Sequence, residues 1–316
     1  MLVYTFRRLL QAIPSLFFLA LLSFFLIHIV PGGPAQSLLG QHSTPARIAA
    51  INRSLGLNKP LYVQFGIWIW HLVHGNFGYS YTFDQPVIQV IGTYLPHTLE
   101  LVSVAIILAH LLAVFLGTIQ GYYQGRWFDH VITTITFFLW SMPVFWLGVL
   151  FVMIFAVNLG WFPSGGISNP NGPGGFGGFI MHATLPITVL VLSTVASWAR
   201  FMRSSLMDAM VQDYVRTARS KGLSEFMVLF KHALKNSLLP IITLFGLSIP
   251  GLFGGALVIE LIFNYPGIGL LTWNAAFQRD YPIILATVMI VGVLTVLGNL
   301  LADLLYGLVD PRITYR

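Results

Sequence analysis

Long stretches of this sequence contain no Asp, Glu, Lys or Arg, among them residues 9–30, 101–125, 131–199, 236–259 and 281–302. An ionised side chain at the centre of a bilayer costs about 2.5–3.5 kcal/mol on insertion scales, so charge is excluded from membrane-spanning helices. Each stretch reaches or exceeds the length of about 20 residues that crosses a hydrocarbon core. Only 8% of the 316 residues are charged, against about 25% in soluble domains. The chain is therefore predicted to be an all-α polytopic membrane protein.

The longest stretch, 131–199, is too long for one helix. It is interrupted by "NLGWFPSGGISNPNGPGGFGG", whose glycines and prolines cannot continue a helix. The stretch therefore divides into two spans. We expect six transmembrane helices, near 9–30, 99–121, 132–157, 183–203, 237–262 and 283–307. The first is read as a retained helix, because it is too long for a signal core and no cleavage pattern follows it.

The expected domain organisation follows from these spans. Residues 1–30 are an N-terminal tail and the first transmembrane helix, 31–97 an external segment, and 98–316 a five-helix core with a cytoplasmic loop at 201–236. Within the external segment, Pro60 suits the start of an amphipathic helix. His71 and His74 are three residues apart, but without a carboxylate or thiol partner they fit a packing role better than a metal site.

The orientation is predicted from the distribution of Lys and Arg. Alternate loops carry twelve basic residues on one side and four on the other. The positive-inside rule therefore puts both termini and the 201–236 loop in the cytoplasm, with the chain in the cell membrane. This distribution also explains the net charge of +6 without any nucleic-acid partner.

Motifs for catalysis or nucleotide binding are not found in the sequence. It contains no GxxxxGK[ST] phosphate loop, no nucleophile elbow and no metalloprotease pattern. We therefore expect a chain that is not an enzyme, binds no cofactor or metal, and leaves any nucleotide hydrolysis to another polypeptide.

The fifth predicted span combines helix-disturbing and polar residues, a pattern typical of a pathway wall. Close packing of helices through small residues would give the same pattern. The candidate pathway residues are Asn236, Ser237, Thr243, Ser248, Pro250, Gly254 and Glu260. Glu260 and Asp303 lie near membrane depth, and a proton relay and a capping or packing role are equally open for them.

The 201–236 loop has a helix–Gly–helix layout. Residues 205–221 are good helix formers, Gly222 offers a left-handed stop, and Ser224 can cap a second helix that runs to about Lys235. A solvated basic loop would explain the charge, but it would not require this layout or its apolar residues. A mechanical element that docks on a cytoplasmic partner explains both. Those apolar residues are Tyr214, Val215, Leu223, Phe226, Met227 and Phe230.

This loop resembles the "EAA" loop of ABC-transporter permeases, in the form found in the dipeptide/oligopeptide/nickel branch, where "DYVRTARxKGL" recurs. The resemblance covers nearly the whole chain. It includes "LGLNKPLYVQF", "GNFGYS", "SMPVFWLGVL", "VIELIFNYPGIGLL" and the terminal "DPRITY", in order. Arg216 replaces the opening acid of the general consensus, and only Ala218 of the alanine pair remains. Both departures are usual for the peptide branch.

The resemblance implies a type I ABC importer permease fold and one membrane subunit of a peptide importer. The implied partners are a homologous second permease, two cytoplasmic ATPases that use ATP and Mg, an external solute-binding protein and the lipid bilayer. The residues implied to couple to an ATPase are Asp213, Tyr214, Val215, Arg216, Ala218, Arg219, Lys221, Gly222 and Leu223. The side chains buried in the ATPase groove would be those of Tyr214, Val215, Ala218 and Leu223. An external gate or binding-protein contact is expected at Asn264, Pro266, Gly267 and Gly269.

Three alternatives remain open at this point, one of which is a scaffold or assembly subunit without transport. The same fold could import nickel, a nickel chelate or glutathione instead of peptides, because sequence alone does not measure a cavity. An ion-coupled secondary carrier would use Glu260, Asp303 or His110 and would predict inverted repeats, of which the two halves show no sign.

Overall fold

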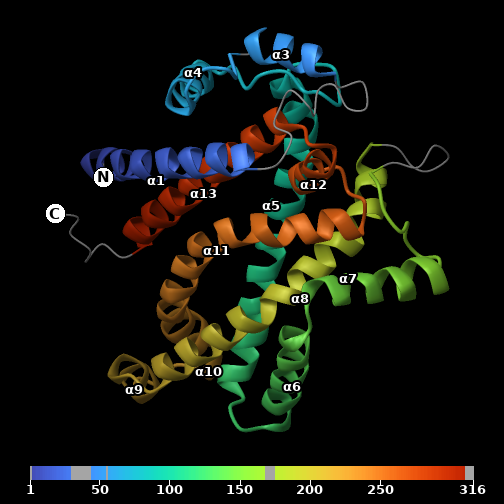
Figure 1. The fold of residues 1–316 in the computed structure, drawn as a ribbon. Coiled ribbons are helices and arrows are strands. Elements are labelled where there is room, and N and C mark those ends of the chain that lie inside the picture. Colours follow the sequence, from blue (N-terminus) through green and yellow to red (C-terminus); the bar gives the residue numbers. More distant parts are fainter. Residues whose placement is uncertain (1, 30–43, 55, 168–174, 310–316) are drawn as a thin grey trace. The chain divides into compact units, whose positions relative to one another are not determined.

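The computed structural model describes residues 2–29, 44–54, 56–167 and 175–309. Within these ranges the chain is helical, and the one β feature is an isolated bridge between Tyr79 and Pro86. The helices are α1 (Leu2–Ile29), α3 (Pro45–Ser54), α4 (Leu61–Val73), α5 (Val87–Tyr122), α6 (Trp127–Ser141), α7 (Val144–Phe151), η2 (Val152–Asn158), α8 (Gly175–Met210), α9 (Asp213–Ser220), α10 (Glu225–Met227), η3 (Val228–Ala233), α11 (Leu234–Ile262), α12 (Ile268–Gln278) and α13 (Tyr281–Val309) (Figure 1).

The predicted all-α membrane architecture is confirmed. Among the described residues, α1, α5, α8 and α13 are each long and apolar enough to cross a membrane. A fifth span results if α6 and the α7–η2 segment are counted together. The predicted span 237–262 lies within α11, a helix of 29 residues in which several side chains fall outside the described part of the chain.

The third predicted span, 132–157, is not one straight helix. α6 and the α7–η2 segment are bent by 102° (Figure 1). Pro143 has no N–H to continue the ladder of α6, and its ring keeps the preceding residue out of the helical region. Met142 is accordingly extended, with φ −79° and ψ 130°. The helix-disturbing Pro143 is present in the sequence of this span, and the structure shows that the helix breaks there.

The chain divides into two compact units. Unit 1 contains Leu99–Tyr265 and the segment from Leu297, and unit 2 contains Leu2–Thr98 and Pro266–Val296. In unit 1, α8 is the central helix and packs against α6, α7 and α11. Its larger core cluster includes Leu101, Ala109, Val189, Leu190, Ala199 and Ile259.

Unit 2 has its own apolar core, built from the first turns of α5, from α12 and from the start of α13. It includes Val87, Ile91, Ile268, Leu271 and Ile283. α4 begins directly after Pro60, which confirms the predicted helix start. Phe65 and Trp68 of α4 lie against Phe24 of α1, with ring centroids 5.3 and 5.8 Å apart, so α4 covers part of α1.

Candidate functional site: an elbow between two helices

The segment 211–233, here called the elbow, connects α8 to α11. The predicted single helix over 205–221 is wrong, because the chain leaves the helix at Val211 and Gln212 and restarts as α9. Gln212 is extended, with ψ 153°, and this turns α9 away from the axis of α8.

Gly222 ends α9 as predicted. Its φ is +75°, in the left-handed region where a Cβ is costly. The N–H of Gly222 donates to the carbonyl of Arg219 at 2.9 Å, and that of Leu223 donates to Ala218 at 3.4 Å. These two bonds form a Schellman motif. The sharp corner therefore depends on a glycine at this position.

Ser224 caps the second helix, as predicted. Its side-chain oxygen accepts a bond of 3.4 Å from the N–H of Met227. From Glu225 the helix continues through α10 and η3 into α11 without a break. The elbow is therefore joined by continuous helix to the predicted fifth span.

α9 is held in place by the chain's own core. Val215 and Ala218 are buried, with 0% and 4% of their surface exposed. They belong to one cluster with Met202 and Leu206 of α8 and Val228 of η3. The expectation that Val215 and Ala218 face a partner is therefore wrong: their side of this amphipathic helix fixes α9 to its own bundle.

The outward side of the elbow carries exposed apolar and basic residues together. Phe226 is 72% exposed and lies 4.5 Å from the ring of Phe230, which is 47% exposed. Tyr214, Arg216 and Lys221 are also exposed. Clustered exposed aromatic residues mark contact sites on proteins. The exposed aromatic residues of this side are Tyr214, Phe226 and Phe230.

An exposed ion pair closes the corner of the elbow. Nε of Arg219 donates to Oε1 of Glu225 at 2.9 Å, and Nη2 donates to Oε2 at 3.2 Å. The pair joins the end of α9 to the start of α10. Nη1 of Arg216 lies 3.7 Å from Oδ1 of Asp213, and both side chains are largely exposed. This second ion pair therefore contributes little to stability.

An apolar groove lies beside the elbow. It has a volume of about 490 Å³ and lies between the last turns of α5 and the α10–η3 helix. Leu111, Phe115 and Tyr122 line one wall, and Phe226 and Phe230 line the other. The exposed aromatic residues of the elbow are thus continuous with a concave surface.

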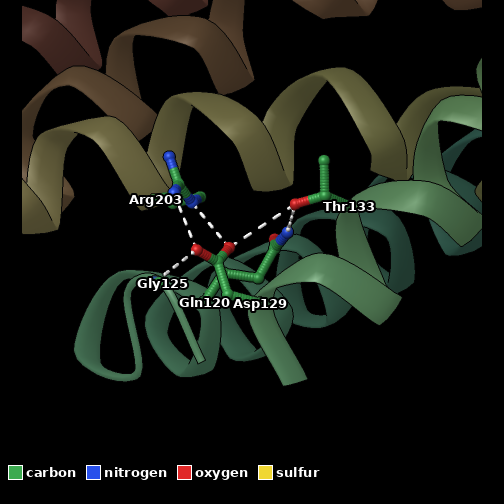
Figure 2. A network of polar contacts seen from close by, with 5 residues as sticks. All are labelled: Gln120, Gly125, Asp129, Thr133 and Arg203. Carbon is green, nitrogen blue, oxygen red and sulfur yellow. Dashed lines mark hydrogen bonds and ion pairs between the residues drawn. The ribbon is translucent and has the colours of Figure 1, made fainter. Parts of the chain in front are cut away.

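A buried ion pair fixes α8 just before the elbow. Arg203 reaches Asp129 of α6 through two bonds of 2.8 Å, from Nε to Oδ1 and from Nη2 to Oδ2 (Figure 2). The N–H of Gly125 also donates to Oδ2 at 3.0 Å. Thr133 lies 3.5 Å from Oδ1 and accepts a bond of 2.9 Å from Gln120. This network ties the end of α5, the start of α6 and α8 together (Figure 2).

Two glycines of α5 bring its backbone close to the same part of α8. A Cβ on Gly117 would lie 2.5 Å from the carbonyl oxygen of Ala199 and 2.5 Å from Cβ of Met202. A Cβ on Gly121 would lie 3.1 Å from the carbonyl oxygen of Arg203. Four-residue spacing of glycines allows such close approach. α8 is therefore held on two sides within one turn of the buried ion pair.

The predicted pathway residues do not share one environment. Asn236 is exposed, Ser248 is half-buried, and Ser237 and Glu260 are buried. The hydroxyl of Ser237 donates to carbonyls of its own helix at 3.0 and 3.1 Å. Thr243, Pro250 and Gly254 belong to α11, but their side chains lie outside the described residues. The pathway assignment stays a prediction.

The predicted gate residues form the turn between α11 and α12. Asn264 is left-handed, with φ 44°, and occupies the capping position of another Schellman motif. The N–H of Tyr265 donates to the carbonyl of Glu260 at 2.8 Å. Gly267, buried, precedes the first residue of α12, while Pro266 and Gly269 are half-buried. Asn264 thus has a local structural role, and the gate stays a prediction.

Three residues of this site were missed from the sequence: Asp129, Gly117 and Gly121. The glycines had a readable signal, since "GTIQG" has the small-xxx-small spacing of close helix contacts. The sequence signal for Asp129 was weaker: it is an acidic residue at the start of an apolar span. Its pairing with Arg203, 74 residues away, has no local signature.

Comparison with known proteins identifies the family. Residues 113–315 match the family described as "Binding-protein-dependent transport system inner membrane component", and residues 1–102 match its N-terminal family. The oligopeptide transport system permease protein AppB of Bacillus subtilis is 42% identical over 316 residues, covering 100% of both chains. The dipeptide transport system permease protein DppB of Alkalihalophilus pseudofirmus is 39% identical, again covering 100% of both.

The fold is shared with a solved transporter. A chain of the MetNI methionine ABC transporter, in an inward-facing conformation, is similar with a TM-score of 0.58 and 14% identity. The match covers 71% of this chain and 97% of that one, and at this identity it concerns the fold alone. The predicted type I ABC importer permease fold is therefore confirmed. The alternative prediction, an ion-coupled secondary carrier, is overturned. This chain belongs to the binding-protein-dependent transport system inner membrane component family.

Proposed function

We propose that this chain is the permease subunit of an ATP-driven importer of di- and oligopeptides, forming half of its translocation pathway. The names of AppB and DppB, which match over their whole length, support this cargo class. The remaining parts would be a homologous permease, two cytoplasmic ATPases that use ATP and Mg, and an external solute-binding protein. Both termini and the elbow would lie in the cytoplasm.

The main structural support for this proposal is the geometry of the elbow. Its inner side, Val215 and Ala218, is fixed to α8 and η3, while Tyr214, Arg216 and Phe226 are exposed. A helix that is rigid on one side and exposes aromatic and basic groups on the other suits a protein partner. The basic groups set orientation more than affinity.

The same attachment explains how force would reach the membrane. When the ATPases close, α9 shifts as one body with the end of α8, because buried side chains join them. The second arm of the elbow continues into α11 as unbroken helix. The partner thereby biases a two-state equilibrium between outward- and inward-facing forms.

Cross-linking tests the contact directly. The chain has no cysteine, so a Tyr214→Cys variant carries a single thiol. In the active complex we expect this thiol to cross-link to the ATPase subunit. Val215→Cys, one residue away but buried, is the matched control and should not cross-link. An active complex in which position 214 never reaches the ATPase would refute the docking role.

Transport assays test coupling and cargo. In proteoliposomes, labelled di- to pentapeptides should enter only with ATP, whereas uptake of glutathione or nickel(II) without peptide uptake would overturn the cargo class. Gly222→Val should uncouple ATP hydrolysis from uptake, since a β-branched residue cannot easily adopt φ +75°. Gly222→Asn is the control, because asparagine tolerates this conformation and should retain coupling.

A further inference from the structure

Unit 2 contains a cavity that the proposed function does not use. It has a volume of about 560 Å³ and is formed by the end of α1, the turn between α3 and α4, one side of α4, the loop after it and the start of α13. Phe24, Trp68 and Leu285 supply apolar walls, and Arg53 and Lys59 supply charge. We call it the basic cavity.

The turn between α3 and α4 fixes both basic residues beside the basic cavity. Gly56 is left-handed, with φ +69°, and its N–H donates to the carbonyl of Arg53 at 3.2 Å. The N–H of Leu57 donates to the carbonyl of Asn52 at 2.8 Å, which completes a Schellman motif. The N–H of Lys59 then donates to the carbonyl of Gly56 at 3.2 Å. Backbone hydrogen bonds through Gly56 thus connect Arg53, in the last turn of α3, with Lys59.

His28 and Gln64 add polar groups to the lining of the basic cavity. Nδ1 of His28 lies 2.7 Å from the carbonyl oxygen of Phe24, and its Nε2 lies 3.2 Å from Oε1 of Gln64. The amide nitrogen of Gln64 donates to the carbonyls of Leu57 and Lys59, at 3.0 and 2.8 Å. Gln64 therefore joins the end of α1 to the turn that carries Lys59.

A buried hydroxyl of the basic cavity lacks a partner. Tyr281 lines the cavity and is only 4% exposed, yet its hydroxyl makes no hydrogen bond within the described part of the chain. Buried polar groups normally have a partner, so an orphaned donor points to a ligand. Burial, together with the nearby charge of Asp280, raises the pKa of Tyr81 to about 12. The hydroxyl of Tyr81, which also lines the cavity, therefore keeps its proton.

The acidic residue nearest to these tyrosines is Asp280, and one of its two carboxylate oxygens is engaged. Oδ2 accepts bonds of 2.6 Å from the hydroxyl of Ser80 and 3.0 Å from the N–H of Thr82, while Oδ1 makes no hydrogen bond within the described part of the chain. Asp280 is fully buried and is not among the lining residues, and none of the described lining residues is acidic. A positive group of a ligand would therefore find no carboxylate on the cavity wall, which disfavours a zwitterionic peptide or lipid.

The position of the basic cavity suits a lipid. Phe24 and His28 lie in the last turns of the apolar stretch Thr5–Ile29, where a spanning helix leaves the hydrocarbon. Tyr62 and Trp70 are exposed on α4, and such rings are typical of the membrane interface. An anionic headgroup at this level can meet basic side chains while its acyl chains meet the apolar walls.

We propose that the basic cavity binds an anionic phospholipid. Its phosphate lies near Arg53, Lys59 and the hydroxyl of Tyr281, and an acyl chain lies against Phe24, Trp68 and Leu285. The headgroup is one without an ammonium group. This lipid anchors the α3–α4 segment to the end of α1.

The test measures the preference of the intact purified transporter for phosphatidylglycerol over phosphatidylcholine by lipid exchange in mixed micelles. Each basic side chain near an anionic lipid raises the affinity for that lipid about fivefold. The double variant Arg53→Gln with Lys59→Gln should therefore lower the preference for phosphatidylglycerol about thirtyfold. The matched control is Lys231→Gln with Lys235→Gln. It removes two exposed charges outside the basic cavity and should leave the lipid preference unchanged. Tyr281→Phe keeps the ring and should lower the preference about tenfold.

Three results would overturn the proposal. The first is an unchanged preference in the Arg53/Lys59 variant while its melting temperature shows that it is folded. The second is displacement of phosphatidylglycerol by inorganic phosphate alone, which would indicate a simple anion site. The third is displacement by triglycine, which would make the basic cavity a cargo site. If the double variant fails to fold, Tyr281→Phe decides the question alone.

Discussion

Two ion pairs in unit 1 have nearly the same geometry and opposite surroundings. Arg203 and Asp129 meet through two bonds of 2.8 Å, and Arg219 and Glu225 meet through bonds of 2.9 and 3.2 Å. The contrast lies mainly in the carboxylates: 3% of the Asp129 side chain is exposed against 51% of Glu225, while the arginines are 29% and 42% exposed. The exclusion of water, rather than the bond lengths, separates a pair that holds helices together from one that contributes little.

This difference divides the region around the elbow into a rigid and an adjustable part. The buried pair and the close glycine contacts fix α8 to α5 and α6. The exposed pair only braces the corner after α9, where either partner can turn to water at small cost. Variants that remove each feature in turn measure how far this division holds.

The largest effect is expected from Asp129→Ala. It leaves the guanidinium of Arg203 partly buried without its anion, and breaking a buried pair in this way costs about 3–5 kcal/mol. The free energy of unfolding, measured by denaturant titration in mixed micelles, should fall by that amount. Adding Arg203→Met should recover much of the loss, because an apolar side chain needs no counter-charge. A loss below about 1 kcal/mol would place the pair in the same class as the exposed one.

A smaller effect is expected from Gly117→Ala. The added methyl group would lie 2.5 Å from the backbone of Ala199, so α5 and α8 must separate, and such overpacking costs about 1–3 kcal/mol. Gly92 lies on the same helix with nothing within 4 Å of an added Cβ, so Gly92→Ala is the control. There we expect a gain of up to about 1 kcal/mol from helix propensity. Equal losses at both positions would argue against the close contact.

The smallest effect on stability is expected from Glu225→Ala. An exposed pair contributes about 0.2–1 kcal/mol, so the free energy of unfolding should change by no more than this. Asp213→Ala removes the longer 3.7 Å contact with Arg216 and should change it less still. If Glu225→Ala were as destabilising as Asp129→Ala, exposure would not be the deciding variable.

Much of the fold could be predicted from the sequence because its rules are local. Charge-free stretches located the helices, and Pro60, Gly222 and Ser224 located their ends through backbone chemistry. The resemblance of the 213–223 stretch to a permease loop supplied the family. Each of these signals lies within a few residues of the feature that it predicts.

The errors arose where distant parts of the chain decide the outcome. The sequence places Pro143 within the third span but does not give the bend of 102° there, because a proline permits a kink whose size depends on the surrounding helices. Val215 and Ala218 were assigned to a partner, although α8 and η3 cover them. An amphipathic helix shows which side is apolar, but not whether its own chain or another covers that side.

The separation of Asp129 from Arg203 also bears on biosynthesis. The two residues are 74 positions apart, so at about 5–20 residues per second the ribosome needs roughly 4–15 s to reach the arginine after the aspartate. During that interval the carboxylate of Asp129 has no arginine to pair with, and α6 has no α8 to pack against. The contact between α6 and α8 can therefore form only after the ribosome has made most of α8, which makes it a late step in the assembly of unit 1.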